Sequence, residues 1–241
     1  MKFVCSLLLF AFTLLVSCSQ APNQPETNSK QPAATPVQGE PCSIKLPGIE
    51  FTKSMHNAAQ NTRVVNGKLW LHSDAKRDNF NDPDSKLTNN TAPLLLTEID
   101  NSKPFTLTAK VTPEFLEMYD AGVLYIYSKD DLWQKFAFER DERGKTRIVS
   151  VRTIGTSDDN NHDVVTRNNV YLKISSDTKT VGFYYSLDKT TWQLARLYKN
   201  DYPTRTWVGI SAQSPIGQGS TVQFEDCSLT QISVTNFRSG I

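Results

Sequence analysis

Residues 132–139 (LWQKFAFE) alternate between apolar side chains and residues that could bind a ligand. Successive side chains of a β-strand point to opposite faces of the sheet. Trp133, Lys135 and Glu139 therefore share one face, and the leucine and phenylalanines between them face a core. A ring, an ammonium group and a carboxylate on one face suit sugar recognition, because rings stack on apolar C–H groups while polar groups bond hydroxyls.

Two other alternating stretches offer polar groups in the same way. In 147–154 (RIVSVRTI) we assign the valines to the core, which places Arg152 on the opposite face. In 207–213 (WVGISAQ) the same reasoning places Gln213 opposite the apolar residues. We expect the three stretches to belong to one sheet, where these polar groups form a binding face. The alternative is a solvated sheet face with cross-strand ion pairs, each of which contributes little.

An acidic stretch at 156–163 (TSDDNNHD) is a second candidate. We interpret it as a loop whose Asp158 and Asp159 join the binding face. Its carboxylate and amide oxygens are ligands suited to Ca²⁺, so a structural calcium ion is one hypothesis. The spacing matches no EF-hand loop, and a simply hydrated acidic loop is the alternative.

Glycoside hydrolysis is the catalytic alternative to binding. It requires two carboxyl groups, about 5–5.5 Å apart for retention of configuration or about 6.5–9.5 Å for inversion. Glu139 with either Asp158 or Asp159 could form such a pair. Elsewhere the sequence contains no spacing typical of a nucleophilic triad, a phosphate-binding loop or a zinc site, so we assign no catalytic residue and no metal ligand.

The stretch 182–197 (GFYYSLDKTTWQLARL) contains Ser186, Asp188 and Trp192 in an S-x-D-x-x-x-W order. This order is close to the Asp-box of sialidase propellers, but it is one residue shorter and has Thr190 in place of glycine. Such boxes recur in every propeller blade, whereas this chain has one copy. We therefore interpret the stretch as a hairpin turn in which Asp188 accepts hydrogen bonds from the backbone.

The elements that must position these residues are almost all strands. Period-2 alternation recurs from residue 105 to residue 229, and turn residues such as SKDD, ERGK and SPIGQGS separate the strands. No internal repeat is visible, which argues against a propeller or solenoid. The pattern predicts an all-β fold, a two-sheet β-sandwich of jelly-roll type.

The first residues indicate export. Residues 1–17 combine Lys2 with an apolar run of about 14 residues, which suits a signal peptide and is too short to cross a bilayer. The run ends in Leu-Val-Ser-Cys, which resembles a bacterial lipobox and predicts lipidation of Cys18. An ordinary secretory signal with an incidental cysteine is the alternative. Lipidation implies a location in the bacterial cell envelope, with the protein anchored to a membrane and facing the periplasm or the exterior.

Residues 18–41 contain no aromatic residue and are rich in Pro, Gln and Asn, so they are expected to form a disordered tether. Residues 42–241 then form a single folded domain. Its two cysteines, Cys42 and Cys227, lie near the ends of the domain, and we expect them to form a disulfide in an exported protein. The alternative is two buried free thiols.

The net charge is +1, or about zero without Lys2, and no basic block stands out. Nucleic acid is therefore not expected as a partner.

Several segments together resemble one family. They are YDAGVLYIYSKDDLWQKFAFE, IVSVRTIGTSDDN, FYYSLDKTTWQLARL and VGISAQSPIGQGSTVQFEDCSL, with the shorter DNF (78–80) and APLLL (92–96). The family is an uncharacterised bacterial and fungal group of concanavalin A-like lectin/glucanase domains, some labelled "regulation of enolase". The resemblance covers about residues 60–232 and implies a concanavalin A-like jelly roll. It implies no settled activity, because one fold hosts many functions.

These observations favour a lipid-anchored, non-catalytic, carbohydrate-binding protein whose partner is a glycan or polysaccharide. Two alternatives stay open: a glycan-active hydrolase, and a protein-interaction or envelope-structural module that uses the same face without a sugar.

Overall fold

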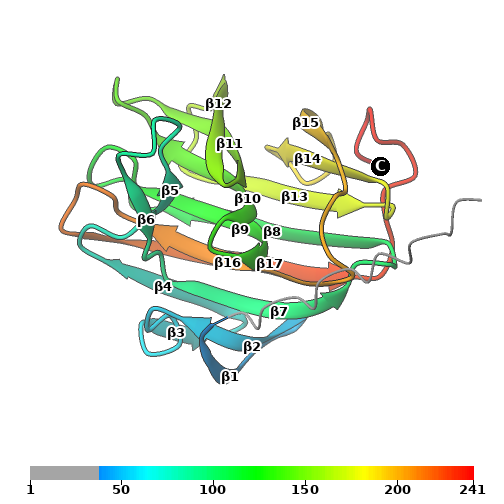
Figure 1. The fold of residues 1–241 in the computed structure, drawn as a ribbon, viewed down its shortest axis with the longest axis horizontal. Helices are drawn as coiled ribbons and strands as arrows, with labels where there is room; N and C mark the ends of the chain where they lie inside the picture. The colour runs from blue at the N-terminus through cyan, green and yellow to red at the C-terminus, as the bar shows by residue number, and fades with distance from the viewer. Residues whose placement is uncertain (1–37) are drawn as a thin grey trace, which may run out of the picture. The chain divides into compact units, whose positions relative to one another are not determined.

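The computed structural model describes residues 38–241, and these residues form an all-β sandwich of two antiparallel sheets (Figure 1). The described residues contain no helix. This architecture confirms the fold class expected from the sequence.

One sheet has eight strands. In spatial order they are β1 (Glu40–Leu46), β2 (Ile49–Met55), β7 (Leu94–Asp100), β16 (Arg205–Gln213), β9 (Ala121–Lys129), β10 (Leu132–Arg140), β11 (Thr146–Ile154) and β12 (Thr156–Val164). The three stretches that carry the predicted binding face are β10, β11 and β16, so they do belong to one sheet.

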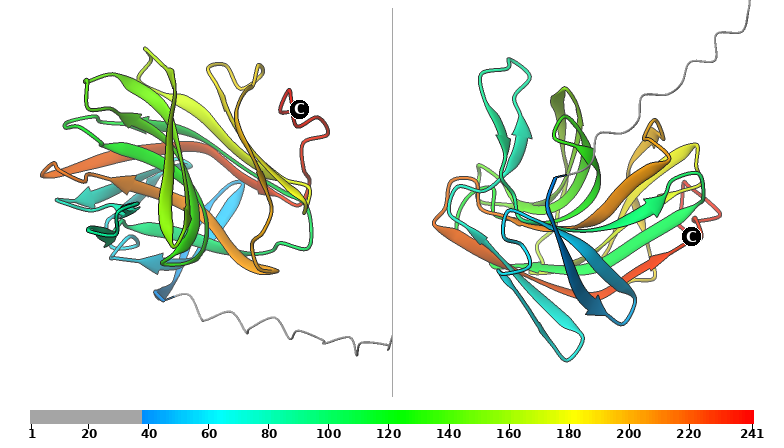
Figure 2. Two further views of the ribbon diagram at one scale, coloured as in Figure 1. Left: turned by 45° about the horizontal axis from the view of Figure 1, so that its top comes forward. Right: turned by 60° about the horizontal axis from the view of Figure 1, so that its bottom comes forward.

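The second sheet has seven strands. In spatial order they are β15 (Gln193–Lys199), β14 (Thr180–Ser186), β13 (Val170–Ser176), β8 (Phe105–Pro113), β17 (Gly219–Thr230), β4 (Lys68–Asp74) and β3 (Thr62–Val65). A separate hairpin consists of β5 (Asn79–Asn81) and β6 (Thr88–Asn90). Figure 2 shows this hairpin and the β11–β12 end of the large sheet rising on the same side of the sandwich.

The main core lies between the two sheets. Alternate residues of β10, such as Phe136 and Phe138, pack there with Leu107 of β8 and Leu172 of β13. The strands form because their apolar residues recur at every second position, which gives each strand one face to bury.

The large sheet is also apolar on its outer face. A second buried cluster includes Val123 and Tyr125 of β9 and Trp133 of β10, and Phe80 of the hairpin packs against it. Strands β9 and β10 are thus buried on both faces, which explains the nearly continuous apolar sequence of β9.

The acidic stretch 156–163 is not a loop. It lies within β12, the edge strand of the large sheet, which pairs with β11. Its polar composition suits an edge position, because charged side chains protect an unpaired strand edge from further pairing.

The predicted disulfide is absent, and Cys42 and Cys227 are free thiols. The two residues lie in different sheets, and each sulfur contacts a carbonyl of its own sheet: Cys42 Sγ lies 3.4 Å from the Phe51 oxygen and Cys227 Sγ lies 3.8 Å from the Glu225 oxygen. The expectation of a bridge is therefore wrong, since the local packing directs each side chain to a separate partner.

The S-x-D-x-x-x-W stretch is the turn between β14 and β15. Asp188 Oδ1 accepts hydrogen bonds from the backbone N–H groups of Thr190 (2.8 Å) and Thr191 (2.7 Å). These bonds hold the pKa of Asp188 well below its usual range. The residue stabilises a hairpin, as the sequence indicates.

The predicted signal peptide, Cys18 and residues 18–37 of the predicted tether lie outside the described residues. Within residues 38–241 there is no helix with the length and apolar content needed to cross a membrane.

Candidate functional site

Strand β10 places Trp133, Lys135 and Glu139 on the outer face of the large sheet, away from the main core. Trp133 belongs to the outer cluster, whereas the alternating Phe136 and Phe138 belong to the core between the sheets. The face assignment for 132–139 is confirmed.

Gln213 lies on the same face at the end of β16. Its Oε1 accepts a hydrogen bond from Lys135 Nζ (3.1 Å), and its Nε2 donates to the Tyr125 hydroxyl (2.7 Å). The amide therefore links β16, β10 and β9 across the sheet.

Arg152 does not join this face. The register of β10 and β11 pairs Lys135 with Val151 and Gln134 with Arg152, so the valine is on the outer face and the arginine is on the inner one. Arg152 instead approaches Asp201 at 3.5 Å. The assignment is wrong because β11 has apolar residues on both faces, and alternation alone does not say which face meets the main core.

Strand β12 separates the two adjacent aspartates. Asp159 pairs with Val151 and lies on the outer face, whereas Asp158 pairs with Arg152 and lies on the inner face. Asp158 is 3.9 Å from Arg196 of β15. Only Asp159 can therefore act together with Lys135 and Glu139.

Trp133 is not an exposed platform. Its exposed fraction is 0%, and its indole N–H donates to the Asp130 carbonyl at 3.1 Å. The hairpin β5–β6 packs against the cluster that contains it, through Phe80. The hairpin of the same chain therefore covers the outer face at Trp133, and the ring is not available to a ligand.

Lys135 holds the hairpin in place. Its buried ammonium group donates to Asp78 Oδ1 (3.0 Å), to the Asn79 carbonyl (2.8 Å) and to Gln213 Oε1 (3.1 Å). These three acceptors use all the N–H donors of the group. Lys135 is therefore a structural residue and has no donor left for a ligand.

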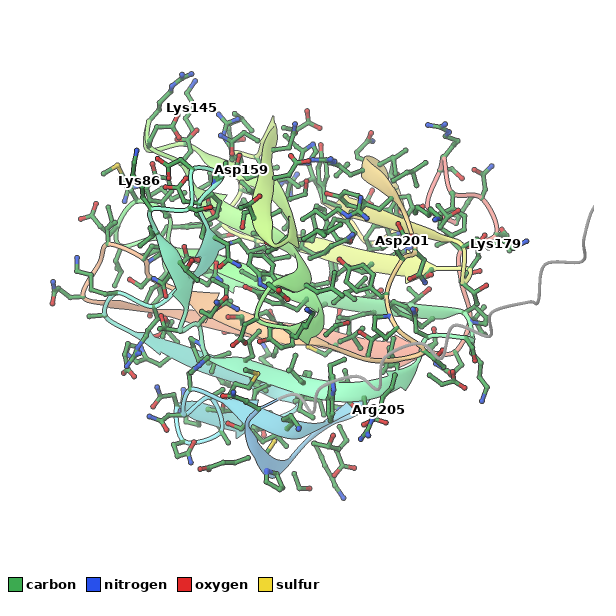
Figure 3. The ribbon with its side chains drawn as sticks, viewed as in Figure 1. Lys86, Lys145, Asp159, Lys179, Asp201 and Arg205 are labelled. Carbon is green, nitrogen blue, oxygen red and sulfur yellow. The ribbon has the colours of Figure 1, made fainter. Side chains whose placement is uncertain are left out.

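A pocket of about 400 Å³ remains between the hairpin, β10, β11 and β12. The residues that line it are Asp78, Phe80, Leu87, Asn89, Tyr119, Lys135, Glu139, Glu142, Val149, Val151, Asp159, Asn161, Pro215 and Ile216. In the view of Figure 3, Asp159 lies at the same end as Lys86 of the hairpin turn and Lys145 of the β10–β11 turn, far from Lys179. Of the predicted ligand-binding residues, the pocket brings together Lys135, Glu139 and Asp159.

Tyr119 is a pocket residue that the strand patterns miss. It is 37% exposed and has a φ of +66°, a left-handed conformation that is uncommon for a bulky residue. Its backbone N–H donates to the Arg140 carbonyl at 2.6 Å, which holds the ring beside β10. Tyr119 and Phe80 lie in YDAG and DNF, so the family resemblance is the signal in the sequence that points to them.

Glu139 has an unusual electrostatic environment. The pKa of its carboxyl is raised to about 8, chiefly by burial; Lys135 opposes the rise, and Asp78, Asp159 and Asp141 add to it. Within residues 38–241 no side chain or backbone group forms a hydrogen bond with this carboxyl. Glu139 is therefore protonated at neutral pH and can donate a hydrogen bond into the pocket.

The described part of the chain contains no group of three His, Cys, Asp or Glu side chains that could hold a metal ion. The calcium hypothesis drew on the carboxylate and amide oxygens of the whole stretch 156–163. Within that stretch, alternation along β12 directs Asp158 and Asp159 to opposite faces, so these two do not bind one ion together.

Comparison with known proteins identifies the family of this chain. A family described as "Protein of unknown function (DUF1349)" matches residues 55–232, well over half of the chain. The chain belongs to this DUF1349 family. The resemblance expected from the sequence is confirmed, and the match spans every residue that lines the pocket.

A relative of this DUF1349 protein is "Regulation of enolase protein 1" of Saccharomyces cerevisiae, which is 27% identical over 171 residues (68% of this chain and 82% of the relative). A crystal structure of a functionally unknown protein from Saccharomyces cerevisiae superimposes with a TM-score of 0.69 at 24% identity, covering 76% of this chain and 97% of the other.

The fold is also similar to part of larger proteins. The GH43 protein BlXynB of Bacillus licheniformis matches 72% of this chain with a TM-score of 0.57 and 15% identity, but only 35% of its own length is covered. The Bacteroides ovatus protein described as "Xyloglucan PUL GH43B" matches 86% of this chain with a TM-score of 0.58 and 15% identity, over 42% of its length. At this identity the similarity shows the fold alone.

Proposed function

We propose that this DUF1349 protein binds a carbohydrate in the pocket between the β5–β6 hairpin and strands β10–β12. The observation that carries the proposal is the pocket's lining. The rings of Tyr119 and Phe80 lie beside the carboxyl groups of Glu139 and Asp159 and the amides of Asn89 and Asn161. Ligand pockets commonly combine apolar and aromatic walls with a few polar groups that fix orientation.

The position of the resembling segments supports the same pocket. DNF supplies Asp78 and Phe80, YDAG supplies Tyr119, and SDDN supplies Asp159. AQSPIG supplies Pro215 and Ile216. These segments are far apart in the sequence and meet at one place, so the features by which the chain resembles its family surround the proposed site.

The fold neighbours also favour sugar as the ligand class. BlXynB and the Bacteroides ovatus protein both bear the label GH43, and another similar structure is described as a GH43 glycoside hydrolase. This is an argument by analogy of fold, so it supports the proposal only together with the pocket's chemistry.

The test is a glycan screen followed by calorimetric titration of the glycans that bind. Tyr119→Ala is expected to weaken binding about tenfold, which corresponds to about 1.4 kcal/mol. Tyr171→Ala, a matched change on the other sheet, is expected to leave affinity unchanged. The proposal is contradicted if no glycan binds, or if Tyr119→Ala and Tyr171→Ala have equal effects.

Hydrolysis is the second candidate function, and one observation favours it. Glu139 has a raised pKa and Asp159 lines the same pocket, so a protonated carboxyl and a second carboxyl face one space. A carboxyl with a raised pKa beside a second carboxyl is a pattern found in acid/base pairs of glycosidases. Of the two aspartates considered, only Asp159 has the right orientation.

The hydrolysis candidate is tested by measuring new reducing ends from each glycan that binds. Glu139→Gln removes the proton donor and is expected to lower the rate by about 10²–10⁴-fold. If the unaltered protein releases no reducing ends from any bound glycan, the pocket is a binding site alone.

We further propose that acylated Cys18 anchors the domain to a membrane of the bacterial cell envelope, with residues 18–41 as the tether. The support is the lipobox-like sequence before Cys18 and the polar composition after it. Cys18→Ala is expected to move the protein from the membrane fraction to the soluble fraction. Retention of the variant in membranes contradicts the anchor.

A further inference from the structure

We propose that the glycan bound in this pocket carries free amino groups, and that Glu139 and Asp159 are the groups that pair with them. The ligand class is then an amino sugar in its unacetylated, cationic form. This inference rests on the proposed carbohydrate-binding function and specifies its substrate.

The pocket's own charges exclude anionic sugars as its best ligands. The charged residues in its lining are Asp78, Lys135, Glu139, Glu142 and Asp159. Lys135 is the sole cation among them, and its three donors are all taken by protein acceptors. A sugar carboxylate or sulfate would therefore meet carboxyl groups and no available ammonium group.

Neighbouring cations do not change this balance. Lys86, on the hairpin turn, pairs with Asp84 at 2.5 Å, and Lys145, on the β10–β11 turn, is outside the lining. Arg143 approaches Glu142 at 3.4 Å, but both side chains are exposed, so this pair contributes little.

Two carboxyl groups are free to act on a ligand. Asp78 is satisfied by Lys135, whereas neither Glu139 nor Asp159 has a hydrogen bond or ion pair with any residue in the described range 38–241. Glu139 is the more informative of the two, because it is only partly exposed and has no compensating partner. Without a ligand its carboxyl holds a proton at neutral pH, and an ammonium group beside it would favour the ionised form, so Glu139 loses that proton when the two groups pair.

The apolar part of the lining distinguishes a sugar from a simple cation. Phe80, Tyr119, Val149 and Val151 form hydrophobic walls beside the two carboxyl groups. A pyranose ring presents apolar C–H groups and hydrogen-bonding groups together, which matches such a lining. A pocket of about 400 Å³ is also within the size range of small-molecule sites.

The test compares two oligosaccharides that differ only in acetylation: hexaglucosamine and hexa-N-acetylglucosamine. Each is titrated calorimetrically into the full-length protein in detergent micelles. Hexaglucosamine is expected to bind at least about tenfold more tightly, a difference of about 1.4 kcal/mol. The advantage is expected to shrink at high salt, because ion pairs near a surface are screened.

Substitutions in the pocket test which residues cause the tighter binding of hexaglucosamine. Asp159→Asn and Glu139→Gln are each expected to reduce the advantage of hexaglucosamine. Asp158→Asn makes the same change as Asp159→Asn one residue earlier, on the other face of β12, and is expected to retain the full advantage. Asp159 is exposed, so its substitution tests the pocket without a change in the core.

Each contrary outcome has a distinct meaning. Equal binding of the two hexasaccharides overturns this inference and leaves carbohydrate binding in place. Binding of hexalysine as tightly as hexaglucosamine overturns it too, because charge alone would then suffice. An advantage that survives both pocket variants overturns the assignment of Glu139 and Asp159. Failure of all glycans in the screen overturns the proposed function itself.

Discussion

Glu139 shows how a single residue acquires an unusual chemistry from its position. Its backbone lies in an ordinary strand, but its carboxyl is shielded from water in the pocket, with three aspartates near it and Lys135 already occupied. The consequence is a pKa of about 8. A group of this kind contributes to the pH dependence of stability as well as to binding.

The stability contribution of Glu139 is expected to decline as pH rises. The folded pKa lies above the ordinary value of 4.5, so the folded state retains a proton that the unfolded state has lost between those two values. The free energy of unfolding should therefore fall across this range, by up to about 1.4 kcal/mol per pH unit from this group. Glu139→Gln removes the dependence, so the variant should gain stability relative to the unaltered protein at alkaline pH.

Urea unfolding at acidic, neutral and alkaline pH measures this difference. The charged groups that act on Glu139 are Asp78 of the hairpin, Lys135 of β10, Asp141 after β10 and Asp159 of β12. A difference between variant and unaltered protein that stays constant with pH would show that Glu139 titrates normally.

Lys135 is expected to matter for stability rather than for binding chemistry. Lys135→Met leaves the Asp78 carboxylate largely buried and without its cation, since the two side chains are 5% and 15% exposed. Breaking a buried pair in this way costs about 3–5 kcal/mol. Denaturant titration measures the loss, with the exposed Lys179→Met as control. A loss of the same small size in both variants contradicts the structural role.

At the scale of elements, the β5–β6 hairpin determines what the outer face can do. It covers Trp133, carries Asp78 and Phe80, and forms one wall of the pocket. Asn81 fastens it to the large sheet, with Nδ2 donating to the carbonyls of Asp130 (3.2 Å) and Gly155 (3.0 Å). Without the hairpin the same strands would expose an aromatic surface of the kind expected from the sequence.

Asn81→Ala is expected to loosen the hairpin without unfolding the sandwich. The variant loses two hydrogen bonds, each worth about 1 kcal/mol. Hydrogen exchange at the Trp133 indole N–H, followed by NMR, should accelerate at least about tenfold. If exchange is as slow in Asn81→Ala as in the unaltered protein, the hairpin does not protect Trp133.

The elements also show why some assignments succeed from sequence and others fail. Strands 132–139 and 207–213 are assigned correctly because large apolar residues mark one face and mixed residues the other. Arg152 is misassigned because β11 is apolar on both faces, so its alternation does not show which face meets the main core. Asp158 is misassigned because the polar stretch 156–163 has the composition of a loop, although it forms the edge strand β12. The burial of Trp133 depends on a hairpin about fifty residues earlier, and no local pattern contains that contact.

At the scale of the whole molecule, the sandwich is stabilised by two apolar layers, with no disulfide among the described residues. The sequence suggests a disulfide because two cysteines, Cys42 and Cys227, remain after removal of the predicted signal peptide and lipidation of Cys18. This expectation fails because pairing depends on where the side chains point, and the Cys42 and Cys227 sulfurs each lie against a carbonyl of their own sheet. The all-β pattern itself is predictable, because it follows from alternation repeated over many strands.

Both thiols are expected to be free and poorly reactive in the folded protein. Burial raises the pKa of Cys227 to about 12 and raises that of Cys42 as well. Since the thiolate is the reactive form, an alkylating reagent should label both residues rapidly only after denaturation. Non-reducing mass spectrometry provides the check, and a linked Cys42–Cys227 peptide contradicts the structure.

The central claim is that the pocket beside the β5–β6 hairpin binds a glycan, and chemical-shift mapping tests it most directly. A glycan selected by the screen is titrated into isotope-labelled protein, and the amide shifts are followed by NMR. The account predicts that the largest shifts cluster at Phe80, Tyr119, Glu139, Asp159 and Ile216. Shifts centred on Trp70 and the outer face of the seven-stranded sheet, or no shifts at all, would contradict it.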